Sequence, residues 1–379
     1  MFPLRNKSWS TAAALFLTVS LGGCAAPLAQ PGLVSPSASN ETASPREVPT
    51  PLFSYTEQAC DPEDPRIAAS GLEIPTGNRP EARVAAACLA LEWLSQPASA
   101  STVVEIVRSP SVHELWEAPN RKGLEAMERL IGSRFLPVGA PIKLLLVGDA
   151  MEWGCTYGRR EIDPYIPRPA PWTEEWLGCS AQRWPCGGSN IELSSGVRFL
   201  FSACPNMDLS RPPNGNEVAR SLRGGHELVH ILQSQLSRRF GFGPVQGFDW
   251  AQEGIPIYFD AAAAWLAGYD GDWRLLEDRS PYAVWRTANP EQELSIRLVS
   301  RMDPSVADTL QAQLRWLLGS LATEYLVAHW GIGAPWAFYS TSFSPGESFS
   351  VRAFGITEEE LTRRIDGYLR SELEQAEAP

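Results

Sequence analysis

The five residues from His226 to His230, which read H-E-L-V-H, constrain the fold of this chain more than any other stretch. They lie in a run from 216 to 239 where apolar residues recur at helical spacing without a proline, which predicts a helix. Residues four apart share one face of a helix, so both imidazoles can bind the same metal ion. Glu227 lies beside them and can act as a general base on a metal-bound water. We therefore expect a fold organised around this helix.

Chance is a poor explanation for this pair of histidines. The chain contains only four histidines, and the probability of this spacing with a glutamate after the first is on the order of 0.01 or less. The alternative is a surface helix with a coincidental pair. Gly224 and Gly225 precede His226 and lower helix propensity, and a close contact with no room for a side chain would explain them.

A catalytic zinc site requires a third protein ligand and an open position for water. One branch of the zincins uses a third histidine, six residues after the second histidine of the motif, with a glycine between them. Gln233 and Leu236 occupy those two places in this chain, which excludes that branch. The third ligand must therefore come from elsewhere in the sequence.

The range 250–258 reads W-x-x-E-G-x-x-x-Y and follows the predicted helix. Together with H-E-x-x-H, this pattern resembles the gluzincins, and most closely the peptidase MA-like family. The resemblance implies that Zn²⁺ is held by His226, His230 and Glu253, with Glu227 as the catalytic base. It also implies hydrolysis of peptide bonds in a peptide or protein substrate.

The resemblance spans roughly 140 to 370, with its specificity concentrated in 226–258, and 353–361 is similar to the closing segment of peptidase MA-like proteins. It implies an α+β, zincin-like fold: a small sheet, an active-site helix and a helical C-terminal part. An edge strand beside the cleft would pair with the extended substrate backbone. Gluzincins commonly add a Tyr or His that stabilises the oxyanion. The candidates here are Tyr258, Tyr325, His329 and Tyr339.

Pro256 departs from the family pattern, because proline inside a helix removes a hydrogen bond and clashes with the preceding turn. Asp249 and Gln252 nevertheless form a capping box that predicts a helix beginning at Trp250. Either the helix begins later, with Pro256 in its first turn, or it is kinked there. If a kink turned the third ligand away, Asp260 could replace it; otherwise Asp260 could support one of the histidines.

The first 23 residues are expected to be an export signal, with a basic start and an apolar run too short for a good membrane span. The run ends in L-G-G-C, which resembles a bacterial lipobox and implies lipid attachment at Cys24. The alternative is an ordinary signal peptide with a chance cysteine.

Residues 24–58 are rich in Pro, Ser, Ala and Thr, a composition that predicts a disordered tether. We expect an extracytoplasmic protein, attached to the membrane of the bacterial cell envelope through its lipid.

The formal net charge is −12 and becomes −14 when the signal leaves with Arg5 and Lys7. This charge argues against nucleic acid as a partner and against electrostatic binding to an anionic membrane surface.

Apart from Cys24, six cysteines remain, and an even number in an exported chain predicts disulfides. The alternative, a second metal site, is disfavoured because the chain has no C-x-x-C pair.

We expect a helical N-terminal subdomain over 59–138 and a metallopeptidase domain over 139–372. Helical spacing of apolar residues in the first region covers 80–94, 102–107 and 123–135. Strands are predicted at 142–147, 191–193 and 197–203, and helices at 260–268 and 305–330.

Two other functions are consistent with the sequence. One is a catalytically idle zincin-fold lipoprotein that acts as an envelope binding module, although such a module has no need of Glu227. The other is a zinc enzyme that acts on a non-peptide bond.

Overall fold

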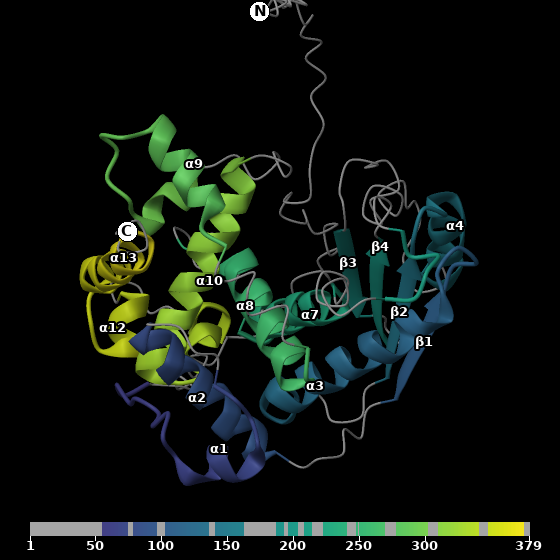
Figure 1. Ribbon diagram of the computed structural model, residues 1–379, viewed down its shortest axis with the longest axis horizontal. Helices are drawn as coiled ribbons and strands as arrows, with labels where there is room; N and C mark the ends of the chain where they lie inside the picture. The colour runs from purple at the N-terminus through teal and green to yellow at the C-terminus, as the bar shows by residue number, and fades with distance from the viewer. Residues whose placement is uncertain are drawn as a thin grey trace, which may run out of the picture.

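The computed structural model combines a small sheet with a larger helical part, which is an α+β architecture (Figure 1). The residues it describes are 55–74, 79–96, 103–135, 141–162, 187–192, 196–203, 208–213, 223–240, 248, 250–269, 278–301, 310–340 and 348–374. The expected signal peptide, Cys24 and most of the tether lie outside these ranges. Within them, no helix combines the length and apolar character needed to cross a membrane.

The chain places helices before, between and after its strands. The strands are β1 (Val104–Arg108), β2 (Ile142–Val147), β3 (Gly187–Glu192) and β4 (Arg198–Ala203). The helices of the first part are α1 (Pro65–Ser70), α2 (Pro80–Ser95), η1 (Glu114–Trp116), α3 (Glu117–Phe135) and α4 (Met151–Ile162). Those that follow the sheet are α7 (Arg223–Phe240), α8 (Trp250–Leu266), α9 (Ser280–Ala288), η4 (Ile296–Arg301), α10 (Leu310–Trp330), η5 (Ala334–Trp336), α11 (Ala337–Ser340), α12 (Phe349–Phe354) and α13 (Glu358–Glu374).

The sheet has the strand order β1-β2-β4-β3. The first two pairings are parallel, whereas β3 lies antiparallel to β4 at the edge. The central strands β2 and β4 are largely buried, and their apolar residues pack into two core clusters because helices cover both faces of the sheet. These observations confirm the strand predicted at 142–147 and, within one residue, the one predicted at 197–203. The strand predicted at 191–193 overlaps β3, which begins earlier, at Gly187, and residue 193 lies outside the described residues.

The prediction of a helix over 102–107 is wrong, because this stretch forms β1. Its β-branched residues favour a strand, and β2 offers it a parallel partner, with Val104 opposite Ile142. The region 59–138 therefore contributes a strand to the same sheet as the following region, in addition to its helices.

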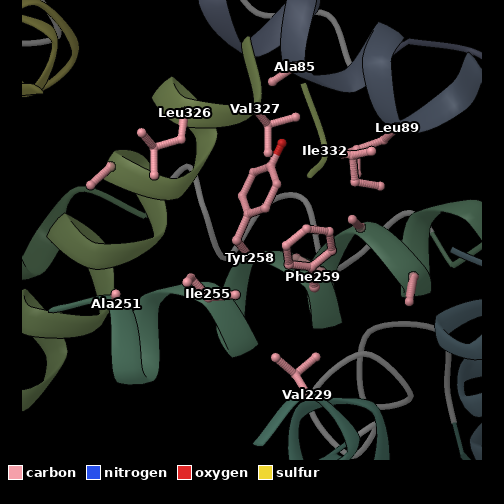
Figure 2. Packing of buried hydrophobic residues seen from close by; sticks show 14 of the residues in the cluster. Ala85, Leu89, Val229, Ala251, Ile255, Tyr258, Phe259, Leu326, Val327 and Ile332 are labelled. Atoms are coloured by element: carbon pink, nitrogen blue, oxygen red, sulfur yellow. The ribbon is translucent and has the colours of Figure 1, made fainter. Parts of the chain in front are cut away.

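The main core lies between α8, α10, α7 and α2 (Figure 2). Helices α8 and α10 approach most closely at two glycines: a Cβ on Gly254 would lie 2.2 Å from the carbonyl carbon of Gly319. Only glycine at both positions allows this separation without moving a backbone. The contact fixes α8 directly beside Glu253.

Candidate metal centre

Helix α7 presents both histidines of the motif, which confirms the predicted helix at the residues that the structure describes. The two glycines before His226 are explained by close contacts. A Cβ on Gly224 would lie 3.3 Å from the side chain of Leu144 on β2. A Cβ on Gly225 would lie 2.6 Å from Oδ1 of Asp260 on α8. The glycines therefore let α7 pack tightly between the sheet and α8.

Helix α8 brings Glu253 to the histidines. It begins at Trp250, as the capping box predicts, and runs through Pro256 to Leu266 without interruption. Glu253 thus lies in the first turn, where the positive end of the helix dipole favours a carboxylate. Of the two alternatives for Pro256, a helix that begins later is excluded, because α8 starts six residues before the proline.

His226, His230 and Glu253 converge on one point, with one ligand atom from each lying within 4.8 Å of the others. The Nε2 atoms of the two histidines are 3.1 Å apart. The carboxylate oxygens of Glu253 lie 3.5 Å from Nε2 of His226 and 3.8 Å from Nε2 of His230. These three residues could therefore hold a metal ion.

The spacing fits a tetrahedral ion. With bonds of about 2.0–2.1 Å, neighbouring ligand atoms in a tetrahedral site lie about 3.3 Å apart. The two histidine nitrogens, 3.1 Å apart, lie close to that separation, and Glu253 directs one oxygen toward each of them, at 3.5 and 3.8 Å. Three ligands also leave the fourth position of a tetrahedron open, as a catalytic site requires.

The electrostatics keep the ligands in their metal-binding forms. Burial lowers the pKa of His226, so its ring is neutral near pH 7. For Glu253, burial opposes ionisation, but His230, the contact with His226 and the cation of Arg315 outweigh it and lower the pKa to about 2. A neutral imidazole and an ionised carboxylate are both good ligands.

Glu227 lies directly beside the three ligands and is buried. Its Oε2 accepts a hydrogen bond of 2.7 Å from Nδ2 of Asn190 on the edge strand β3. The amide holds one carboxylate oxygen and leaves the other for a water or a substrate. The edge of the sheet is therefore next to the metal-binding group.

Three neighbours of the site escape the sequence patterns. Asn190 holds Glu227, Gln233 contacts Nδ1 of His230 at 2.8 Å, and the buried Arg315 of α10 acts on Glu253. Gln233 departs from the pattern that has three histidines, and this departure alone does not indicate a role for its amide. Nothing in the local sequence around Asn190 or Arg315 signals a role.

Asp260 is not part of the metal-binding group, which contains Glu253 instead. Its carboxylate lies against the backbone of Gly225, one residue before His226. This position agrees with a supporting role beside the ligands.

Among the four candidates for oxyanion stabilisation, Tyr258 points away from the site. Figure 2 shows its side chain extending from α8 toward Val327, while Val229 of α7 lies on the other side of α8. The ring is fully buried, and burial together with Glu324 raises the pKa of its hydroxyl. Tyr258 therefore belongs to the core.

Tyr325 and His329 contact each other at 4.2 Å between ring centroids, further along α10. His329 Nδ1 lies 3.3 Å from Glu57, and burial raises the pKa of Tyr325 to about 12. Both rings therefore contact other side chains, and Glu57, which lies against His329, belongs to the first described segment. Tyr339 is buried on α11, which packs against the motif helix α7.

The structure contains a disulfide between Cys60 and Cys88, which joins the segment before α1 to α2. Cys155 is disulfide-bonded as well. The predicted bridges are therefore confirmed for these three cysteines, and the remaining ones lie outside the described residues.

A scan against protein-family models, a search of curated proteins and a search of solved structures each found no match to this chain.

Proposed function

We propose that this protein is a zinc-dependent peptidase of the gluzincin type, with a zincin-like fold. The observation that carries the proposal is the convergence of His226, His230 and Glu253, with Glu227 buried beside them. Two imidazoles and one carboxylate are a donor set typical of catalytic zinc.

Each residue of the site would have a separate role in peptide hydrolysis. When bound, zinc would polarise the scissile carbonyl and lower the pKa of its water toward ~7. Glu227 would take a proton from the attacking water and pass it to the leaving amine. Asn190 would keep the Glu227 carboxylate oriented, because it holds one oxygen at 2.7 Å.

The sheet supports a peptide as the substrate. Strand β3 lies at the edge of the described sheet, and one of its residues contacts Glu227. An extended peptide could add to this edge through backbone hydrogen bonds, which would place its carbonyls near the metal-binding group. This arrangement favours a peptide bond over other scissile bonds.

The alternative is an idle binding module in the envelope, anchored by the predicted lipid on Cys24. The contact between Asn190 and Glu227 favours an enzyme, because a module that only binds has no use for an oriented base. Attachment to the membrane and location outside the cytoplasm belong to the same proposal.

The test is Glu227→Gln, because an amide cannot accept the proton of the water. We expect peptide cleavage to fall at least ~10²–10⁴-fold with zinc content retained. New N-termini in a diverse peptide mixture would be counted by mass spectrometry. Glu105→Gln, at a largely exposed carboxylate on β1, is the matched control and should cleave like the wild type. Equal cleavage by Glu227→Gln and the wild type would contradict the mechanism.

A further inference from the structure

We infer that Gln233 is a positioning residue that locks His230 and the first turn of α8, which carries Glu253, into the geometry of the metal site. The inference rests on the proposed zinc site and names a residue outside the set of ligands and base. Gln233 lies one turn after His230 on α7 and is 4% exposed.

The amide of Gln233 has a single consistent orientation. Its Nε2 donates to the backbone carbonyls of Ala251 and Gln252, at 3.2 and 3.3 Å. Because this end of the amide must be the donor, Oε1 is the atom that faces Nδ1 of His230, at 2.8 Å. An amide oxygen only accepts, so Nδ1 of His230 must carry the proton.

This hydrogen bond selects the tautomer of His230 that a metal needs. With the proton on Nδ1, the Nε2 atom keeps its lone pair, and it is Nε2 that faces His226 and Glu253. A hydrogen bond to the other ring nitrogen is how metal-binding histidines are usually oriented. Gln233 therefore prepares the second ligand.

Pro256 explains why Gln233 also reaches α8. In a helix, the carbonyl of Gln252 would accept from the N–H four residues later, but that residue is Pro256, which has none. The Nε2 atom of Gln233 donates to this carbonyl instead. The helix can thus continue through the proline, and its first turn is tied to α7.

The two contacts together make one buried amide the link between two ligands on different helices. A buried amide is costly unless both of its ends are hydrogen-bonded, and both ends of Gln233 are. The position of Glu253 relative to His230 therefore depends on this side chain.

The first experiment compares Gln233→Met with Gln235→Met, and measures zinc affinity by competition with a chelator. Methionine keeps the length of the side chain and removes its hydrogen bonds. Gln235 is a matched control on the same helix, because its Nε2 bonds Glu192 of β3 at 2.7 Å. We expect Gln233→Met to weaken zinc ~10–100-fold, as is typical of residues that orient ligands, and Gln235→Met to leave the affinity unchanged. Equal affinity in Gln233→Met and the wild type would overturn the inference.

The second experiment reads the tautomer of His230 without any metal. Nitrogen-15 NMR of histidine-labelled apo protein distinguishes a proton on Nδ1 from one on Nε2, and four histidines make the assignment tractable. We expect the Nδ1–H form in the wild type and in Gln235→Met, and a mixture in Gln233→Met. An Nε2–H form in the wild type would overturn the inference.

The outcomes separate this inference from the proposed function. If wild-type protein binds no zinc, the proposed function fails, whatever the tautomer is. If it binds zinc and Gln233→Met binds it equally well, only the role of Gln233 fails.

Pro256→Ala supplies the missing N–H, so we expect the loss of zinc affinity caused by Gln233→Met to be smaller in that background. An equal loss in both backgrounds would contradict the link to Pro256.

Discussion

Two buried polar clusters in this molecule balance their charges in different ways. The ionic cluster, which consists of Arg79, Arg279, Glu324, Tyr368 and Glu372, ties α2, α9, α10 and α13 together. Arg79 contacts both carboxylates, and the Tyr368 hydroxyl donates to Glu324 at 2.6 Å. Two guanidinium groups thus face two carboxylates, and the protein itself supplies both signs of charge.

The metal-binding group of His226, His230 and Glu253 is built on the opposite principle. Two ring nitrogens and a carboxylate oxygen, all of them possible metal ligands, converge within 4.8 Å of one another. Burial lowers the pKa of His226, and for Glu253 its contacts with the two histidines and the charge of Arg315 lower the pKa, so the group suits a cation from outside the chain. Buried polar groups can therefore hold helices together where the protein supplies both cations and anions. They can form a metal site where acceptor atoms of several side chains converge.

The largest expected effect is on stability, from Glu324→Leu in the ionic cluster. The carboxylate is fully buried, so its loss leaves two guanidinium groups facing the single carboxylate of Glu372. We expect the free energy of unfolding to fall by about 3–5 kcal/mol in denaturant titrations, with zinc affinity unchanged. Glu360→Gln, at the surface pairs with Arg363 and Arg364, is the control and should leave the free energy of unfolding nearly unchanged. A loss of zinc affinity in folded Glu324→Leu would contradict the claim that the two clusters have separate roles.

The next effect separates the third ligand from its neighbour. Glu253→Ala should weaken zinc by more than ~100-fold, because it removes a ligand, whereas Asp260→Ala should cost no more than the ~10–100-fold typical of outer-shell partners. Zinc affinity of both variants by chelator competition gives the order. The reverse order would move the ligand assignment to Asp260 and remove the main support for the gluzincin resemblance.

A smaller effect is expected at the contact of α8 with α10, the helices that carry Glu253 and Glu324. Gly254→Ala places a methyl group 2.2 Å from the Gly319 backbone, so the helices must separate. We expect a loss of about 1–3 kcal/mol in unfolding free energy, together with weaker zinc binding, since Glu253 is adjacent. Gly367→Ala on α13, where a Cβ meets nothing within 4 Å, is the control and should not destabilise the protein. Unchanged zinc affinity in Gly254→Ala would show that the site tolerates movement of α8.

Local sequence patterns were sufficient to predict the motif helix and the carboxylate, Glu253, that the structure brings to the two histidines. Spacing places His226 and His230 on one face, and the capping box at Asp249 and Gln252 predicts where α8 begins. The helix spacing at 102–107 was misleading, because a short apolar stretch fits either period and the partner strand decided the outcome. That residues four apart share one face of a helix can be predicted from local sequence, whereas the partner of a strand depends on the whole fold.

The supporting residues could not be predicted, because their roles arise from contacts between distant segments. Asn190 reaches Glu227 only through the register of β3 against β4 and the packing of α7 on that strand. The role of Gln233 depends on Pro256, which in the sequence argued against a continuous helix. Two apparent departures from the pattern therefore compensate each other in space.

Metal content of the folded protein tests the central claim most directly. Wild-type protein and His230→Ala would be equilibrated with zinc, dialysed and analysed for metal, with circular dichroism to verify folding. The account predicts one zinc per wild-type chain and almost none in His230→Ala, because two ligands do not hold the ion. A stoichiometry near zero in folded wild-type protein, or one that His230→Ala leaves unchanged, would contradict it.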